Sequence, residues 1–154
     1  MRSVLLLFAI SLCVHAFGQE VEPDIDFLKY AGKKIAIPKG CVPSSETDIR
    51  GCGHQQVQWY TYTNMKELDT SFPKLIAMAE KGREKSEFNA ISFGAVMTGY
   101  RITVTYGSSN SKAYLFYLKG LVNNNAILLE ISSNTDITKN ADLGAIPSLL
   151  IKIE

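Results

Sequence analysis

Apolar and polar residues alternate along much of the C-terminal half of the chain, which is the pattern of β-strands. In residues 100–106 the alternation is regular, with apolar side chains at even positions and polar ones at odd positions. Residues 114–122 carry apolar side chains at both parities, which is typical of a strand covered on both faces. We therefore expect a sheet in which residues 114–122 form a central strand.

Two further strands belong to the same predicted sheet. Asparagine tolerates the left-handed backbone of a tight hairpin turn, so Asn123–Asn125 predicts one. Residues 126–131 then return as a strand, with Ile127, Leu129 and Ile131 inward and Glu130 outward. Residues 88–97 form another strand, which we expect to end in a turn at Thr98–Gly99. The segment from Phe88 to Ser133 thus predicts a four-stranded antiparallel meander.

The main helix is predicted between residues 64 and 85. Its buried side is a stripe of apolar residues at spacings of three and four: Leu68, Phe72, Leu75, Ile76 and Ala79. Asn64 and Glu67 have the spacing of a capping box at its start. Because proline donates no backbone hydrogen bond, Pro73 predicts an interruption and a new first turn near Thr70 or Ser71.

Shorter elements are expected on either side of these. Residues 24–30 are expected to form a short helix, and residues 40–53 a turn-rich loop. Two strands are expected at residues 33–38 and 57–63. The strand 57–63 places Trp59 on one face and Tyr60 and Tyr62 on the other. The tail 142–154 fits a helix begun at Asp142 or an edge strand, and Pro147 favours the helix because proline suits a first turn. The fold class is therefore α+β: a mainly antiparallel sheet packed by one long helix and a short C-terminal helix.

The N-terminus has the parts of a secretory signal. A basic start is followed by an apolar run over residues 4–14, with Ala16 and Gly18 suitably small for cleavage before Gln19. The run is shorter than the roughly 20 apolar residues that cross a membrane. We therefore expect residues 1–18 to be a signal peptide and residues 19–154 to form a single domain in the periplasm or outside the cell.

Charge and cysteine content agree with an exported protein. Loss of Arg2 with the signal leaves 15 basic and 15 acidic residues, which argues against a nucleic-acid surface because such surfaces need clustered positive charge. Cys41 and Cys52 remain after Cys13 is removed, and two cysteines in an oxidising compartment most simply pair. A redox pair or a metal site is the alternative, but a metal site needs further ligands and only His54 is near.

In the order of its elements the chain resembles the PsbP-like fold of extrinsic photosystem subunits and small exported bacterial proteins. The resemblance covers roughly residues 55–154 and is carried by the helix around Phe72–Ala79, the hairpin Tyr114–Ile131 and the closing segment Pro147–Ile153. It implies an α/β sandwich that serves as an accessory or interaction module without catalysis. The loop with Cys41 and Cys52 has no counterpart there, and the resemblance assigns no functional residues.

Few residues suit catalysis. His54 is the single histidine of the expected mature chain and lies outside any nucleophile motif, and Glu130 is an outward, solvated carboxylate on an apolar strand. No phosphate loop, dinucleotide motif or metal-ligand cluster occurs, so we expect no cofactor. The candidate binding residues are Trp59, Tyr60, Tyr62 and His54, although core packing also explains a tryptophan or tyrosine in a strand.

The sequence therefore favours an exported, non-catalytic binding or accessory module for a protein or small ligand that it does not name. A secreted antagonist or immunity-type protein and a small hydrolase that uses His54 or Glu130 are the alternatives. No membrane span is expected in the mature chain, and the sequence leaves the oligomeric state open.

Overall fold

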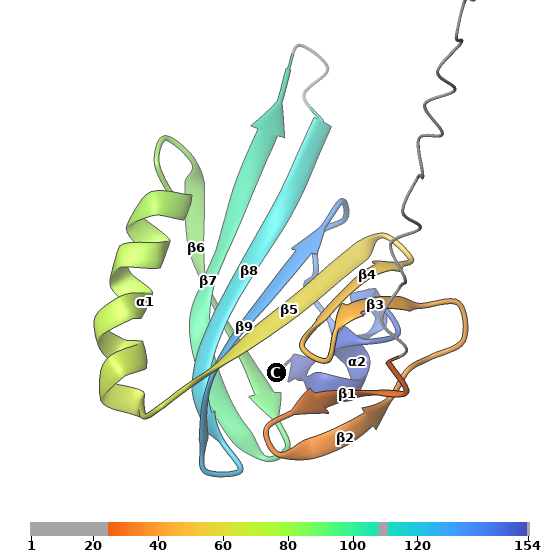
Figure 1. The fold of residues 1–154 in the computed structure, drawn as a ribbon. Coiled ribbons are helices and arrows are strands. Elements are labelled where there is room, and N and C mark those ends of the chain that lie inside the picture. Colours follow the sequence, from red (N-terminus) through yellow and green to blue (C-terminus); the bar gives the residue numbers. More distant parts are fainter. Residues whose placement is uncertain (1–24, 108–110, 154) are drawn as a thin grey trace, which may run out of the picture.

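A computed structural model describes residues 25–107 and 111–153, so the expected signal peptide lies outside the described residues (Figure 1). The elements are β1 (Phe27–Tyr30), β2 (Lys33–Ala36), β3 (Val42–Ser45), β4 (Asp48–Cys52), β5 (Gln55–Tyr62), α1 (Met65–Ala79), β6 (Glu84–Ser92), β7 (Ala95–Tyr106), β8 (Ser111–Val122), β9 (Asn125–Ser133), the 3-10 helix η1 (Asn140–Asp142), α2 (Pro147–Leu150) and β10 (Lys152–Ile153). This is mostly antiparallel sheet with one long and one short C-terminal α-helix, within the expected α+β class.

Eight strands form one antiparallel sheet in the order β10-β6-β7-β8-β9-β5-β4-β3, and β1 and β2 form a separate hairpin. Strands β3 to β5 pair in chain order, and so do strands β6 to β9. Helix α1 separates these two groups in the chain, and the pairing of β5 with β9 joins them. As expected, β8 is an inner strand with neighbours on both sides.

Of two tight turns predicted from asparagine and glycine, one is present at the predicted position and one is not. Asn123 and Asn124 have φ of 46° and 62°, so the predicted left-handed turn between β8 and β9 is confirmed. The turn expected at Thr98–Gly99 is wrong, because the chain reverses at Phe93–Gly94 instead, with φ of 47° and 85°. Gly99 lies inside β7, where an added Cβ would approach the Tyr117 carbonyl oxygen to 1.8 Å. Glycine is needed there for close strand contact.

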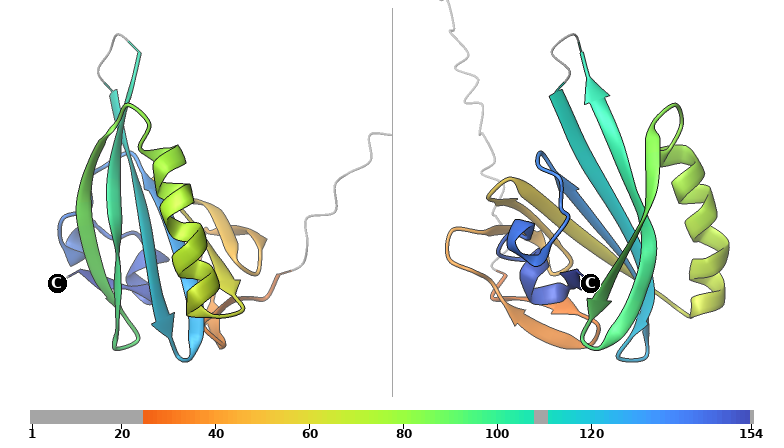
Figure 2. Two further views of the ribbon diagram at one scale, coloured as in Figure 1. Left: turned by 90° about the vertical axis from the view of Figure 1, so that its left-hand side faces the viewer. Right: turned by 180° about the vertical axis from the view of Figure 1, so that it is seen from behind.

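One face of the sheet, the core face, carries the larger hydrophobic cluster. Trp59, Phe116, Leu118 and Leu129 lie on it, each at most 1% exposed. The β1–β2 hairpin and the C-terminal segment cover it, opposite α1 (Figure 2). The Trp59 indole N–H donates to the Lys29 carbonyl across 2.6 Å, which fastens the hairpin to the sheet.

A chain of buried hydroxyls also links three parts of this core. Ser92 donates to the Leu150 carbonyl at 2.8 Å, so its single hydroxyl hydrogen is in use there. The Tyr30 hydroxyl, 2.9 Å from Ser92 Oγ, must therefore donate to it. Burial raises the pKa of Tyr30 to about 12, and this phenol acts as a donor at every physiological pH. The chain joins β1, β6 and α2.

Two N-terminal segments differ from expectation. Residues 24–30 were expected to be helical, but Leu28 and Tyr30 point inward on either side of exposed Lys29, which is the period of a strand. Residues 40–53 were expected to be a loop but contain the β3–β4 hairpin, because β4 adds to the edge of β5 and buries Ile49. The Cys41–Cys52 disulfide is present and closes this hairpin.

Helix α1 is continuous from Met65 to Ala79, so the expected interruption at Pro73 is wrong. Pro73 lies on the exposed side, where water can hydrate the carbonyl that its missing N–H leaves free. Asn64 caps the helix as predicted, since its side chain accepts from the Glu67 N–H at 3.0 Å. The C-terminal segment contains both of the predicted alternatives, a helix and an edge strand. Helix α2 begins at Pro147, and β10 then pairs with β6.

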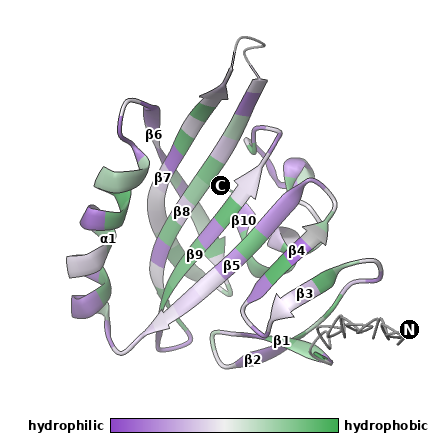
Figure 3. Cartoon of the chain, turned by 45° about the horizontal axis from the view of Figure 1, so that its top comes forward, coloured by the Kyte–Doolittle hydropathy of each residue, from purple (hydrophilic) through white to green (hydrophobic). Residues whose placement is uncertain are grey.

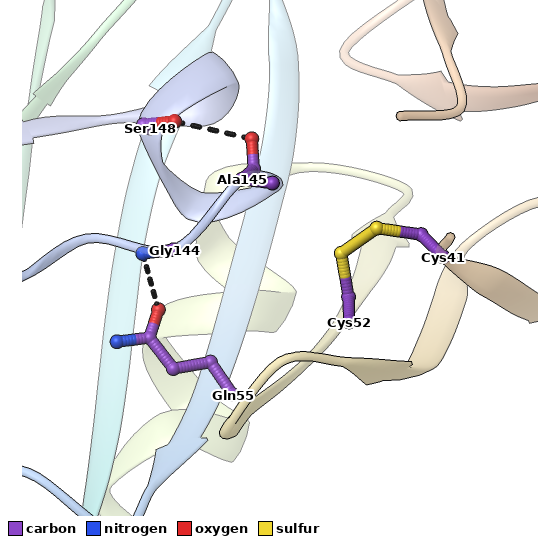
Figure 4. The surroundings of a disulfide bond; sticks show 6 residues. All are labelled: Cys41, Cys52, Gln55, Gly144, Ala145 and Ser148. Carbon is purple, nitrogen blue, oxygen red and sulfur yellow. Dashed lines mark hydrogen bonds between the residues drawn. A yellow bond between two sulfur atoms is a disulfide. The ribbon is translucent and has the colours of Figure 1, made fainter. Parts of the chain in front are cut away.

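Gln55 holds the C-terminal segment against β5 next to the disulfide (Figure 4). Its amide donates to the Asp142 carbonyl at 2.8 Å and its oxygen accepts from the Gly144 N–H at 2.7 Å. A Cβ at position 144 would lie 2.8 Å from that oxygen, which explains the glycine. The buried side chain of Gln55 thus forms the hydrogen bonds with the Asp142 carbonyl and the Gly144 N–H that a neighbouring strand would otherwise form.

We expect Gln55→Met to lower the free energy of unfolding by about 2 kcal/mol, because two partly buried backbone groups lose their partner while the volume is kept. Urea denaturation followed by the fluorescence of Trp59 measures this. Gln56→Met is the matched control, since Gln56 is the exposed neighbour on the same strand. Equal stability of the two variants would contradict the role given to Gln55.

Candidate functional site

The face opposite the core face, the helix-side face, is only partly covered. Leu68, Phe72 and Ile76 of α1 pack on Ala126 and Leu128 of β9. Figure 3 shows apolar and polar residues mixed along β5, β8 and β9 without a regular alternation. The part of the helix-side face nearer β4 lies beyond α1 and carries polar and aromatic side chains.

A row of six directly opposed residues crosses this face on six strands, and we call it the polar row. Its members, from β4 to β6, are Asp48, Gln58, Glu130, Tyr117, Tyr100 and Glu87. Antiparallel pairing places opposed residues on the same face with their Cβ atoms about 5 Å apart. Glu130 therefore lies between an amide and a phenol, near the middle of the sheet.

Glu130 is a half-buried carboxylate with little compensation. It accepts a hydrogen bond from the Gln58 amide at 3.2 Å, and the same amide donates to the Tyr60 hydroxyl. Among the residues that the structure describes, no lysine or arginine forms an ion pair with it. Burial raises the pKa of Glu130, and the Gln58 hydrogen bond opposes this in part.

The two tyrosines beside Glu130 show the same electrostatic bias. Burial is the main cause that raises the pKa of Tyr117 and of Tyr60, and the Glu130 carboxylate raises both further. Asp48 adds to the effect on Tyr60. Burial disfavours a charge of either sign, but the contributions of Glu130 and Asp48 to these shifts reflect a negative local potential, and such a potential favours a cation.

A hollow of about 130 Å³ lies over Glu130, and we call it the Glu130 hollow. Gln58, Tyr117, Leu115 and Ser132 line it together with Asp48 and Arg50. Arg50, which also lines the hollow, already forms an ion pair with Asp48 at 3.1 Å. The hollow accepts one side-chain end and is smaller than the roughly 300–1,000 Å³ of pockets for drug-sized ligands.

A larger hollow, the helix groove, lies between α1 and strands β6 and β7 and measures about 590 Å³. Phe72 and Tyr100 stack in it with ring centroids 6.2 Å apart. Its lysines are paired within the chain, Lys119 with Asp69 at 2.5 Å and Lys85 with Glu80. The carboxylate of Glu87, which also lines the groove and forms no ion pair with a described residue, is exposed to solvent, whereas that of Glu130 is half-buried.

The residues predicted from the sequence are dispersed. Trp59 is 1% exposed in the core, which agrees with its core-anchor interpretation. Tyr62 packs beside α1, and His54 is exposed at a turn, lining another hollow with Tyr106. Tyr60 alone of the four lies beside Glu130.

Glu130 points away from the core face as predicted, but it is half-buried rather than solvated. Gln58 was not singled out from the sequence, and neither Tyr117 nor Asp48 was predicted to lie beside Glu130. Strand parity assigns Gln58 to the same face as Tyr60, but the register between distant strands is needed to place these side chains together.

Comparison of the chain with protein-family models, curated proteins and solved structures found no match. Within residues 25–107 and 111–153 no helix has the length and hydrophobicity needed to cross a membrane. The same residues contain no group of three or more histidine, cysteine or acidic side chains placed to hold a metal ion.

Glu130→Gln is expected to raise the free energy of unfolding at neutral pH, because the amide avoids the desolvation of a carboxylate and still accepts from Gln58. The raised pKa of Glu130 in the folded state fixes the sign. The cost is absent at low pH, where the acid is protonated in both states, and grows as pH rises above its ordinary value of 4.5.

Urea denaturation at about pH 3 and pH 7 tests this dependence. The two proteins should have similar stability at the lower pH, and the variant should be the more stable one at the higher pH. Glu84→Gln, at an exposed position of β6, serves as the control and should show no such difference. A Glu130→Gln protein that is less stable at pH 7 would show that the carboxylate is well solvated or compensated.

Proposed function

We propose that this protein is an exported, non-catalytic binding module that receives a cationic side chain, lysine or arginine, of a partner protein in the Glu130 hollow. The observation that carries the proposal is the half-buried Glu130 carboxylate, which lacks an ion pair among the described residues and lies opposite Tyr117 and Gln58. The disulfide of Cys41 with Cys52 and the N-terminal signal pattern support export.

The chemistry of the hollow supports a cation. A lysine or arginine placed there would pair with Glu130, and the aromatic ring of Tyr117, which lines the hollow, attracts cations as well. Charge-assisted hydrogen bonds to a partly desolvated carboxylate are stronger than neutral ones. A neutral or anionic group would leave the carboxylate uncompensated or repel it.

The shape supports a protein partner over a small molecule. A hollow of about 130 Å³ takes the end of one side chain, and Leu115 in its lining is partly accessible. Tyr60, which shares the Gln58 amide with Glu130, is exposed nearby. Tyrosine and arginine are enriched at protein interfaces, where a central anchor in a small pocket is surrounded by weaker contacts. The Glu130 hollow has the size and the rim of such an anchor site.

The PsbP-like resemblance belongs to this proposal. The order of α1, the paired strands β6 to β9 and the closing segment from Pro147 supports it. An accessory or interaction module, as the resemblance implies, agrees with binding rather than catalysis. A secreted antagonist or immunity-type protein would use the same hollow, and it differs only in that binding suppresses the partner's activity.

Nuclear magnetic resonance titration with Nα-acetyl-lysine amide tests the proposal. Amide signals of β5, β8 and β9 around Gln58, Tyr117 and Glu130 should shift, and the affinity should fall roughly tenfold or more in Glu130→Gln. Binding should weaken as pH falls through the raised pKa of Glu130, because protonation removes the charge.

Two controls make this titration decisive. Nα-acetyl-norleucine amide has the same length without the charge and should produce no comparable shifts. Glu84→Gln removes an exposed carboxylate elsewhere and should leave lysine binding unchanged. Equal binding of the norleucine compound, equal binding by Glu130→Gln, or shifts confined to the helix groove would each contradict the proposal.

A small hydrolase is the second candidate because two carboxylates, Asp48 and Glu130, line the same hollow and Glu130 has the raised pKa that a general acid needs. Turnover of chromogenic glycosides, esters or amides by the purified protein, abolished in Glu130→Gln, would establish it. His54 lies at a separate hollow and takes no part in this arrangement.

A further inference from the structure

The outer edge of β6 is largely open. β10 has two residues and pairs only with Ala90 and Ile91 of β6. Within the described part of the chain, the preceding residues Glu84–Asn89 have a strand neighbour on the β7 side alone. Figure 2, left, shows this half of β6 at the sheet border, with α1 lying over the face and not beside the edge.

An open edge of this length presents backbone N–H and C=O groups that can pair with another strand. Proteins usually block such edges with very short strands, bulges, prolines or charges. The opposite edge, β3, is blocked in this way, because it has four residues, contains Pro43 and has an irregular register. The charges on the open part of β6 are instead of both signs.

Lys85 and Glu87 are two positions apart and point to the helix-side face, since they oppose Ile102 and Tyr100 of β7. Lys85 pairs with Glu80 of its own chain, and no described residue forms an ion pair with Glu87. Two like charges at these positions would oppose self-pairing in each register that sets either residue against its own copy or against the other. Opposite charges allow it in a register that places one against the other.

Symmetry limits the registers. In a two-fold antiparallel pair of identical strands, side chains directly opposite each other share a face, so one residue must oppose its own copy. Pairing centred on Lys85 or on Glu87 sets like charges face to face, which is destabilising. Pairing centred on Phe88 leaves only residues 87–89 before the partner meets β10.

Pairing centred on Ser86 avoids these conflicts. It opposes Glu84 to Phe88 and engages residues 84–88 without reaching β10. It also sets Lys85 of each copy opposite Glu87 of the other, which makes two attractive cross-strand pairs. We propose that the protein forms a two-fold dimer in which β6 pairs with β6 of a second copy in this register, so that the two sheets are continuous.

In this dimer the helix groove lies beside the joint between the two sheets. Lys85, Glu87 and Asn89 of β6 line that groove. Because the two-fold axis is perpendicular to the joined sheet, both copies of α1 lie on the same side of it and the two grooves face the joint. The Glu130 hollow lies three strands away from this edge, so dimerisation leaves it accessible.

Charge-reversal variants test the register. The dimer dissociation constant of each is measured by sedimentation equilibrium on the mature protein with its disulfide formed. Lys85→Glu sets two glutamates opposite each other in both cross-strand pairs, and Glu87→Lys sets two lysines there. Each variant alone should dimerise roughly tenfold more weakly than the wild type, or more. An equimolar mixture of the two should regain the wild-type affinity as a heterodimer, because both pairs are then attractive.

Lys112→Glu, an exposed lysine on the inner strand β8, is the matched control and should dimerise like the wild type. Since Lys85→Glu also removes the pair with Glu80, recovery on mixing is the decisive result, as it cannot arise from a folding defect. A wild-type protein that stays monomeric at all concentrations, or a dimer that is indifferent to both reversals, would overturn the proposal. So would two weakened variants that do not associate when mixed.

Discussion

The pairing of β5 with β9 is the interaction on which the rest of the structure depends. It joins two groups of strands that α1 separates in the chain, through eight opposed residue pairs from Gln55–Ser133 to Tyr62–Ala126. Its register sets Trp59 against Leu129 on the core face and Gln58 against Glu130 on the helix-side face. A slip of one residue would exchange the two faces and place the carboxylate in the hydrophobic core, so core packing and the position of the candidate site are specified together.

The two faces of the sheet differ in how completely they are covered. The core face is covered by the β1–β2 hairpin and the C-terminal segment, which Trp59, Ser92 and Gln55 fasten through buried hydrogen bonds. The helix-side face is covered in part and keeps a carboxylate in a desolvated position at a cost in stability. We propose that this cost is retained because a partner's cation compensates it on binding.

The sequence predicted the fold class, β5, the inner position of β8, the Asn123–Asn124 turn, the helix cap and the disulfide. These depend on local patterns or, for the cysteines, on pairing of the two that remain. It failed where tertiary context decides: Gly99 signals a turn but serves close contact, Pro73 is tolerated on an exposed helix side, and β4 becomes a strand by adding to β5. Two residues of the candidate site, Tyr60 and Glu130, were named from the sequence, each for a different role. Their proximity could not be predicted, because it depends on the register of strands that are distant in the chain.

The claim that Glu130 is a receptor for a cation can be tested on the carboxyl group itself. Titration of its side-chain carboxyl carbon by ¹³C magnetic resonance gives its pKa with and without Nα-acetyl-lysine amide. The account predicts a pKa above the ordinary value of 4.5 in the free protein, and a fall when the lysine compound is bound, because a bound cation favours the ionised form. An ordinary pKa in the free protein, or one that the lysine compound leaves unchanged, would contradict it.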